Sequence, residues 1–371
     1  MSDNLLKYKI GIELIPNVGS INAKKLIAYC GGVEAVFKQS KKALQKIPGI
    51  GVVIANEIYN QKVLDRAEKE LDFIAKFNIK TFFYLDSDYP ERLKQCEDSP
   101  VLFFFKGNHK LDLNNNRFIS IVGTRKATDY GKKICDEMVN DLCLMGYEPV
   151  IVSGLAYGID ITAHKSALKN DLATIAVLGH GLDTIYPIVH RSIAKEILEK
   201  GALITDFTSK TKFDRNNFIK RNRIIAGLSD ATIVIESSLE GGALITADLA
   251  NSYNREVFAV PGNVGSKYSQ GCNSLIKTNR AALVETAEDV ALLLGWESKE
   301  SKITQQKIQF PVLEKDEELI ISHLRNVKQD TIDAISHSAG MPVSKVSSIL
   351  LNLEFNGLVK CKPGKVFTIE K

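Results

Sequence analysis

The most basic segment of the chain is SKTKFDRNNFIKRNR, from Ser209 to Arg223. Phe213 and Phe218 are interleaved with six cations and one acid, Asp214, so the segment carries +5 while the whole chain carries +4. Basic side chains follow nucleic-acid phosphates and aromatic rings stack on bases. The segment therefore predicts a surface for single-stranded nucleic acid, in preference to a helix-capping loop with core aromatics. The cations are Lys210, Lys212, Arg215, Lys220, Arg221 and Arg223.

A second candidate for phosphate binding lies in SIVGTRKATDYGKKI, residues 120–134. An apolar strand stops at Gly123, the chain turns through Thr124 and Arg125, and a helix is expected from about Asp129. The first N–H groups of a helix are free to bind phosphate, and the arginine adds charge. The turn alone does not distinguish a small nucleotide, a dinucleotide cofactor or a nucleic-acid backbone.

The sequence gives less support to a cofactor site or an active site than to nucleic-acid binding. A dinucleotide fingerprint needs G-x-G-x-x-G after the first strand, whereas this strand runs into G-T-R-K-A-T, and there is no Walker motif, so we expect no cofactor. SGLAYGIDITAH offers Ser153, Asp160 and His164 for catalysis. A helix-capping Asp160 with His164 bonded near it explains the last two without chemistry. We therefore expect a protein that is not an enzyme.

These residues need a sheet to position them. From Phe118 onward, short apolar runs alternate with helical stretches, which predicts a mostly parallel, Rossmann-like α/β sheet covered on both faces. Ligands of such sheets bind beyond the carboxyl ends of the strands, where GTR, SGLAYG, GHGLD and the Gly241-Gly242 turn should face one site. The expected strands are 118–122, 149–152, 174–178, 202–205, 232–236, 257–260 and 282–284.

Smaller modules flank this domain. Residues 1–78 contain LIPNVGSINAKKLI and LQKIPGIGVVIANEI, which fit tandem helix-hairpin-helix (SAM-like) turns that either contact DNA or only pack. The Rossmann-like domain is expected at 79–296, followed by a polar linker at 297–313. Residues 314–371 predict three helices and a hairpin, a winged-helix-like module whose recognition helix, Ser344 to Asn356, is mostly apolar. That helix favours protein contact or packing over DNA reading.

Composition agrees with a globular protein without metal. Hydrophobic residues make up 44% of 371 residues, and no apolar run approaches the roughly 18 residues that span a bilayer. MSDNLLKYKI lacks the apolar core of a secretory signal, so the expected location is the cytoplasm, without membrane attachment. The six cysteines are scattered without CxxC pairs, which predicts reduced thiols and no metal site.

An ordered set of motifs between about residues 80 and 290 resembles the DNA-processing protein A family (DprA, also called Smf). The motifs are DYPERL, DSPVLFFFKG, VGTRKATDYG, SGLAYGIDITAH, AVLGHGLDTIYP, FIKRNRIIAGLS, GGALITADLA and VFAVPGNVGSKYSQGCNSLI. Three positions depart from the family pattern. Ile219 replaces the usual proline, Gly241 the usual serine, and Thr278-Asn279-Arg280 the usual glycine.

The resemblance implies a Rossmann-fold homodimer that binds and protects single-stranded DNA and loads RecA onto it in natural transformation, without known catalysis. The DNA-binding residues that follow from the motifs and the basic segment are Gly123, Thr124, Arg125, Ser153, Gly154, Lys212, Arg215, Phe218, Lys220, Arg221, Asn222, Arg223, Gly241 and Gly242.

The sequence leaves two other functions open. Nucleoside-monophosphate phosphoribohydrolases use a related sheet, but they carry PGGxGTxxE, whereas EGGALITADLA here has neither the GT pair nor the glutamate. A structural dimeric scaffold for RecA is the third possibility. Binding of an oligonucleotide without RecA, and release of adenine from AMP, separate the three.

Overall fold

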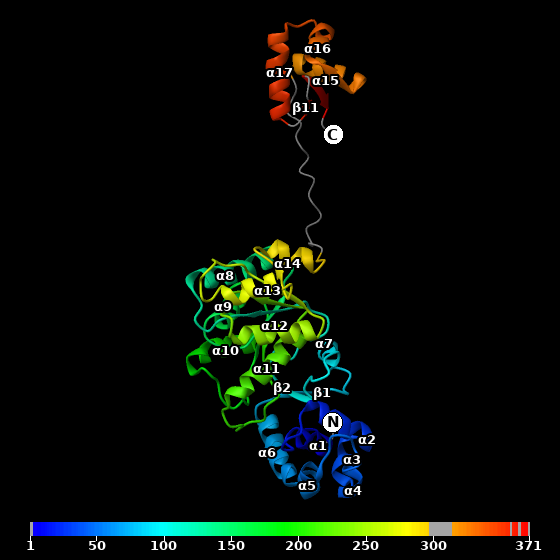
Figure 1. The fold of residues 1–371 in the computed structure, drawn as a ribbon, viewed down its shortest axis with the longest axis vertical. Coiled ribbons are helices and arrows are strands. Elements are labelled where there is room, and N and C mark those ends of the chain that lie inside the picture. The colour runs from blue at the N-terminus through cyan, green and yellow to red at the C-terminus, as the bar shows by residue number, and fades with distance from the viewer. Residues whose placement is uncertain (1–2, 297–313, 357, 363–364, 370–371) are drawn as a thin grey trace. The chain divides into compact units, whose positions relative to one another are not determined.

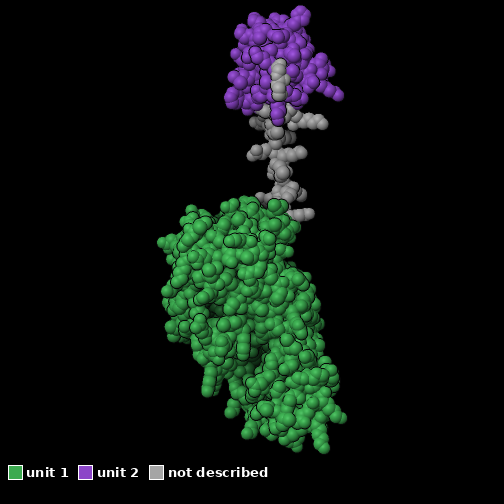
Figure 2. Space-filling model, viewed as in Figure 1, with its two compact units in different colours: residues 1–301 green, residues 302–371 purple. Residues whose placement is uncertain are grey.

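The computed structural model describes residues 3–296, 314–356, 358–362 and 365–369 (Figure 1). The chain divides into two compact units, Met1–Ser301 and Lys302–Lys371, coloured separately in Figure 2. The predicted linker at 297–313 lies outside the described residues. The predicted boundary between residues 78 and 79 stays a prediction, because both sides belong to the first unit.

A nine-stranded sheet forms the centre of the first unit, in the order β1-β2-β6-β5-β4-β3-β7-β8-β9. The strands from β6 to β9 in this order run parallel, whereas β2 is antiparallel to both β1 and β6. The predicted mostly parallel sheet is therefore confirmed, with strand ends within two residues of those expected. The strands are β1 Lys80–Phe83, β2 Leu102–Gly107, β3 Phe118–Val122, β4 Val150–Ser153, β5 Thr174–Val177, β6 Ala202–Thr205, β7 Ala231–Val234, β8 Glu256–Ala259 and β9 Ala282–Leu283.

Helices cover both faces of this sheet. Successive side chains of a strand point to opposite faces, so Phe118 and Val122 of β3 join one core while Ile119 and Ile121 join the other. Helices α11 and α12 supply apolar side chains to the first core, and α8 and α9 to the second. These helices are α8 Asp129–Leu144, α9 Ile159–Lys169, α10 Arg191–Lys200, α11 Arg215–Leu228, α12 Gly242–Ser252, α13 Gln270–Lys277 and α14 Ala287–Leu293, with a 3₁₀ turn at Ile188–His190.

The N-terminal helices have their own core, which continues onto β2. Phe103 and Phe105 of β2 belong to the central core, whereas Leu102 and Phe104 belong to the core of the helices. The strand is thus shared, which explains why the helices and the sheet form one unit. The helices are α1 Asp3–Glu13, α2 Ser20–Cys30, α3 Val33–Lys38, α4 Lys41–Leu44, α5 Val52–Asn60 and α6 Lys62–Lys76, followed by α7 Glu91–Lys94 between β1 and β2.

The second unit is a winged helix, as predicted. Three helices pack around a core that includes Leu324, Ile335, Leu350 and Phe367. The expected hairpin is present, and a third strand, β10, which the sequence pattern did not indicate, pairs with β12. Its elements are α15 Lys315–Val327, β10 Gln329–Thr331, α16 Ile332–Ala339, α17 Val343–Phe355, β11 Val359–Lys362 and β12 Val366–Ile369. None of the described helices of either unit is long and apolar enough to cross a bilayer.

Candidate nucleic-acid interface

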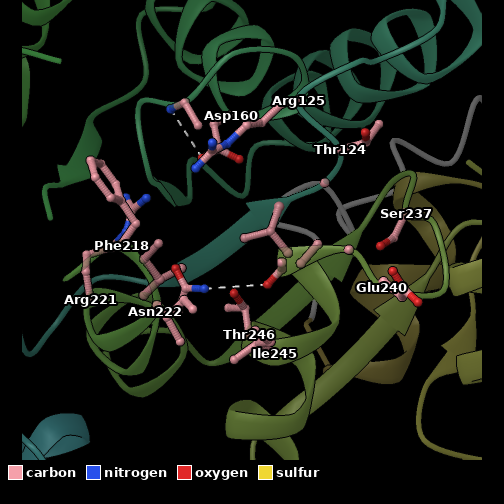
Figure 3. Close-up of a pocket in the computed structure, with 18 of the residues that line it drawn as sticks. Thr124, Arg125, Asp160, Phe218, Arg221, Asn222, Ser237, Glu240, Ile245 and Thr246 are labelled. Carbon is pink, nitrogen blue, oxygen red and sulfur yellow. Dashed lines mark hydrogen bonds between the residues drawn. The ribbon is translucent and has the colours of Figure 1, made fainter. Parts of the chain in front are cut away.

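A cavity of about 350 Å³ opens beyond the carboxyl ends of β3 and β7 (Figure 3). After β3 the chain continues to β4 on one side, while β7 pairs with the other side of β3. This is a topological switch point, where parallel sheets bind ligands. The cavity is walled by the turn after β3, the loop after β4, one side of α11, and the β7–α12 loop with the start of α12.

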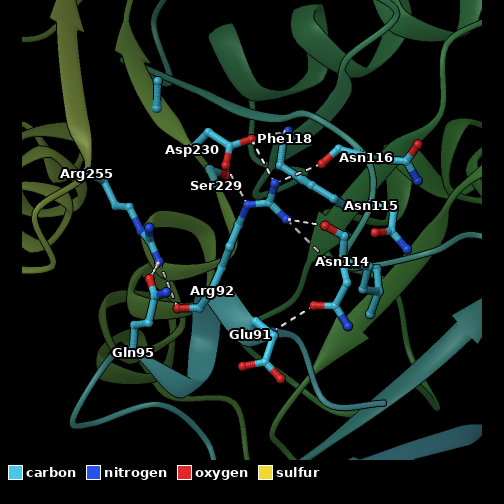
Figure 4. A network of polar contacts seen from close by, with 12 residues as sticks. Glu91, Arg92, Gln95, Asn114, Asn115, Asn116, Phe118, Ser229, Asp230 and Arg255 are labelled. Atoms are coloured by element: carbon cyan, nitrogen blue, oxygen red, sulfur yellow. Dashed lines mark hydrogen bonds and ion pairs between the residues drawn. The ribbon is translucent and has the colours of Figure 1, made fainter. Parts of the chain in front are cut away.

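The opposite ends of β3 and β7 are fixed by Arg92 of the DYPERL motif (Figure 4). Its guanidinium contacts both carboxylate oxygens of Asp230, at 2.5 and 3.1 Å, and donates to the carbonyl of Asn116 at 2.8 Å. Asp230 also accepts the backbone N–H of Phe118 at 2.8 Å. Because Asp230 precedes β7 and Phe118 begins β3, this network sets the two strands side by side and so positions the switch point at their far ends.

The turn after β3 is held by Glu236, at the end of β7. The backbone N–H of Thr124 donates to the Glu236 carbonyl at 2.7 Å. The Glu236 carboxylate accepts the N–H and hydroxyl of Thr128, at 2.9 and 2.6 Å, and the Thr128 hydroxyl caps α8. Glu236 is therefore structural, and its bonds leave the side chain of Arg125 exposed at the cavity mouth. Within the described residues no acceptor is recorded for the Arg125 guanidinium.

Helix α11 begins at the basic segment because Asp214 caps it, accepting the N–H of Asn216 at 2.8 Å. Residues three, four and seven apart share a helix face, and one such face lines the cavity. It carries Arg215, Phe218, Asn222 and Ile225. Arg215 is exposed and Phe218 is partly buried, so a charge and a ring project together toward the opening.

Arg221, next to this face, also lines the cavity but is only 4% exposed. One of its terminal nitrogens donates to the carbonyl of Val177, at the end of β5. Its Nε is buried and has no partner among the described residues. Burial lowers the pKa of Arg221 to about 10, against the opposing effect of Asp160, and Arg125 lowers it further. The site therefore holds a positive charge with one unused donor, as an anion-binding pocket requires.

Asp160 lines the same cavity, as does Glu240. Burial raises its pKa, while Arg221, the N–H of Ala156, Ser153 and Arg125 pull it back down. A carboxylate here offsets part of the charge of Arg221 and keeps the guanidinium in place when no ligand is bound.

The first turn of α12 faces the same cavity. Gly241 is the N-cap of this helix, so no capping side chain binds the first N–H groups. A methyl group on Gly242 would meet no atom within 4 Å, so the space in front of the turn is open. The Nδ2 of Asn222 lies 3.5 Å from the Gly242 carbonyl, which ties α11 to this turn. Free N–H groups at a helix start attract anions, so the glycine turn adds neutral donors opposite the arginines.

The structure brings most of the predicted residues to this cavity. Those that line it are Gly123, Thr124, Arg125, Arg215, Phe218, Arg221, Asn222, Gly241 and Gly242. Ser153 and Gly154 lie beneath it: the Ser153 hydroxyl donates to the Ile121 carbonyl at 2.6 Å, and a methyl group on Gly154 would overlap the Arg221 guanidinium.

Three predicted residues lie elsewhere. Lys212 and Lys220 are exposed but do not line the cavity. Arg223 points to the other side of α11, where it forms an ion pair with Asp206 and donates to the Asp98 carbonyl. Its structural position follows from helix geometry, since a residue two places after Arg221 lies about 200° around the helix.

The cavity also includes residues that the motifs did not indicate, among them Ser237, Glu240, Ile245 and Thr246. A signal for two of them was present. Ile245 and Thr246 follow Gly242 by three and four residues, so they share its helix face once α12 is known to begin there.

The candidate catalytic residues do not form a nucleophile–base pair. Nδ1 of His164 lies 2.7 Å from the Thr174 hydroxyl, and burial lowers the pKa of this histidine to about 3. The polar partner of His164 is thus Thr174, at the start of β5, and this contact accounts for the histidine without catalysis. The Ser153 hydroxyl donates its hydrogen bond to a backbone carbonyl of β3. Within the described chain, no group of three or more His, Cys, Asp or Glu side chains is placed to hold a metal.

The chain is similar to known proteins in sequence and in fold. The profile of the DNA recombination-mediator protein A family matches residues 80–295, and that of the DprA winged helix domain matches residues 311–365. Protein Smf from Synechocystis sp. is 31% identical over 398 aligned positions that cover 98% of each chain. DNA processing protein DprA from Streptococcus pneumoniae is 40% identical over 210, covering 57% of this chain and 72% of that protein.

Two solved structures are similar. The X-ray structure of DprA from Streptococcus pneumoniae has a TM-score of 0.67 and 33% identity, covering 77% of this chain and 97% of that one. DNA processing protein A from Helicobacter pylori, solved to study its single-stranded DNA binding mode, has a TM-score of 0.53 and 28% identity, covering 60% and 98%. With its sheet, winged helix and profile match in agreement, the chain belongs to the DNA-processing protein A (DprA/Smf) family.

Proposed function

We propose that this protein binds and protects single-stranded DNA in the cavity at the switch point, without catalysing a reaction on it. One observation carries the proposal: Arg125, Arg215 and Arg221 converge on one cavity with the ring of Phe218. Arginines bind phosphate oxygens through charge-assisted hydrogen bonds, and a ring at the opening can stack a base. The buried Nε of Arg221, which lacks a partner in the described chain, supports an anionic ligand.

Single-stranded DNA suits this site better than duplex. A base can reach Phe218 only if it is free of its complement, while the arginines take the backbone on the same side. The Helicobacter pylori relative, studied for its single-stranded DNA binding mode, supports the same substrate class. The test is a titration of labelled single- and double-stranded oligonucleotides of equal length. Tighter binding of the single strand is expected, whereas a preference for duplex or for AMP rejects the proposal.

We further propose that the bound strand is passed to RecA in the cytoplasm, during DNA processing, natural transformation and recombination. Support comes from the family profile, which describes a DNA recombination mediator. The assay measures RecA ATPase activity on single-stranded DNA coated by a single-strand binding protein. Faster onset with this protein than with its Arg125→Ala variant is expected, and equal onset contradicts loading.

A homodimer through the Rossmann-like domain completes the proposal. Leu283 in the last strand of the sheet, and Leu292 and Leu293 in the next helix, are exposed. Exposed apolar side chains at a sheet edge favour association. Light scattering after size exclusion is expected to give twice the chain mass, and Leu292→Glu with Leu293→Glu to give the monomer. A monomeric parent protein rejects this part.

A further inference from the structure

Four rings gather beside the cavity, beyond the carboxyl ends of β5 and β6. Tyr186 and Phe213 lie 4.4 Å apart between ring centroids, and Phe213 lies 5.9 Å from His180 in a nearly parallel arrangement. Phe218 lies 5.2 Å from Phe213 and 5.7 Å from Tyr186. His180 is buried, but Phe213 is 53% and Tyr186 45% exposed. The cluster thus has one buried ring, that of His180, and two rings open to solvent.

We propose that the exposed pair of Tyr186 and Phe213 is a second base-stacking subsite, for a nucleotide next to the one held at Phe218. The inference rests on the proposed function and extends it from one cavity to a longer track. Phe218 belongs both to the cavity and to the cluster, so the two surfaces are continuous.

The tilt between the rings selects an unstacked strand. The ring of Phe218 is tilted by 53° to Phe213 and by 56° to Tyr186, so a base stacked on Phe218 and a base stacked on the exposed pair are not parallel. Neighbouring bases of a duplex are parallel, so a strand that occupies both places must be single and locally unstacked. This geometry adds a second reason for single-strand preference.

The charges around the pair fit a phosphate backbone. Lys210 and Lys212 precede Phe213 and are exposed, and Arg215 follows it at the cavity. The nearby acids are engaged by the protein's own backbone: Asp183 accepts the N–H of Lys210 at 3.0 Å, and Asp214 caps α11. The three cations outnumber these two acids, so the surface between the exposed pair and the cavity carries a net positive charge.

The loop that carries Phe213 is held in place before any ligand binds. Glu70 of α6 accepts the N–H and hydroxyl of Ser209, and Arg66 donates to the Ser209 carbonyl. A methyl group on Gly181 would overlap the Thr208 carbonyl, so the β5 and β6 loops approach at van der Waals distance there. A pre-organised platform loses little conformational entropy on binding.

The test uses full-length protein and oligo-dT of increasing length, from about 3 to 15 nucleotides, in fluorescence anisotropy. The wild-type affinity is expected to rise in a step when the strand is long enough to reach the exposed pair. The double variant Tyr186→Ala with Phe213→Ala should lack that step. For longer strands it should bind about 5- to 150-fold more weakly, the range for one stacked base, while the shortest strands bind as before. Tyr29→Ala, an exposed tyrosine of α2, is the matched control.

A second readout does not depend on affinity. Trp296 is the single tryptophan of the chain, so Phe213→Trp adds one reporter at the subsite. Long oligo-dT should quench the added fluorescence, and strands confined to the cavity should not. An unchanged length series together with an unquenched reporter overturns the subsite. An equal loss of affinity at every length also overturns it, because the pair would then only support Phe218. A changed oligomeric state of the double variant overturns it as well. Failure of the wild type to bind any oligonucleotide instead rejects the proposed function.

Discussion

Glu70 accepts two hydrogen bonds from Ser209, from the backbone N–H at 2.8 Å and from the hydroxyl at 2.6 Å. Glu70 lies in α6 of the N-terminal helices, and Ser209 begins the basic segment. The N-terminal helices therefore determine where the loop with Lys210, Lys212 and Phe213 stands. They act on the candidate site without lining its cavity.

Replacing Glu70 by alanine is expected to weaken single-strand binding and to lower the free energy of unfolding by about 1–3 kcal/mol. The reason is that the Ser209 N–H is left buried without an acceptor. Urea unfolding and oligo-dT anisotropy measure the two effects. Glu68→Ala, on the same helix but solvent-exposed and paired with Lys7, is the control. Unchanged DNA affinity in Glu70→Ala would show that the loop keeps its position without this contact.

Arg125→Ala should reduce single-strand affinity by about 10- to 150-fold, because one hydrogen bond to a charged group is worth about 1.5–3 kcal/mol. The fold should not change, since the side chain is exposed and no acceptor for it is recorded in the described chain. Lys126→Ala is the control, an adjacent exposed cation that does not line the cavity. If both variants lose affinity equally, Arg125 contributes only its positive charge and makes no specific contact with a phosphate.

Gly154→Ala tests the buried arginine without removing it. The added methyl group would overlap the Arg221 guanidinium, so Arg221 must move from its bond with the Val177 carbonyl. We expect weaker DNA binding together with a destabilisation of about 1–3 kcal/mol from overpacking. Thermal unfolding and anisotropy measure both. Gly51→Ala, whose methyl group meets no atom within 4 Å, should change neither, and wild-type binding by Gly154→Ala would exclude Arg221 from the site.

Glu13 predicts a pH dependence of stability. Burial, reinforced by Asp206 and opposed by Arg223, raises the pKa of Glu13 to about 7. Because folding raises this pKa, the protonated Glu13 carboxyl contributes its full stabilisation of the fold below about pH 4.5. This contribution is lost as the pH rises through about 7. The loss is about 3 kcal/mol at about 1.4 kcal/mol per pKa unit. Glu13→Gln should therefore be more stable than the wild type at pH 8 and similar at pH 4.5. Parallel urea curves for the two proteins at every pH would contradict this.

The sequence predicted the sheet well because its strands are buried on both faces. Such strands, like FISIV and ALIT, are continuous apolar runs that no surface element mimics. The sequence also predicted the ligand edge of the sheet, because the carboxyl ends of parallel strands lie on one edge, whereas the strand order and the switch point between β3 and β7 came from the structure. The third strand of the winged helix, QDT, is polar and half exposed, so no hydrophobic pattern marked it.

The site was predicted less completely because charge in a sequence does not say which way a side chain points. Arg221 and Arg223 are equally basic and two residues apart, yet one lies under the cavity and the other pairs with Asp206. Only the packing of α11 on the sheet determines which side of this helix faces the cavity. Glu70, which anchors the basic loop from a distance of 139 residues in sequence, carries no local signal at all.

The most direct test of the central claim is the salt dependence of oligonucleotide binding. If Arg125, Arg215 and Arg221 each contact a phosphate, the logarithm of the binding constant should fall with the logarithm of salt concentration. The slope expected for single-stranded DNA is about −2, at about −0.7 for each phosphate. The same titration with duplex of equal length should show weaker binding at every salt concentration. A slope near zero, or tighter binding of the duplex, would contradict a single-strand site at the switch point of the sheet.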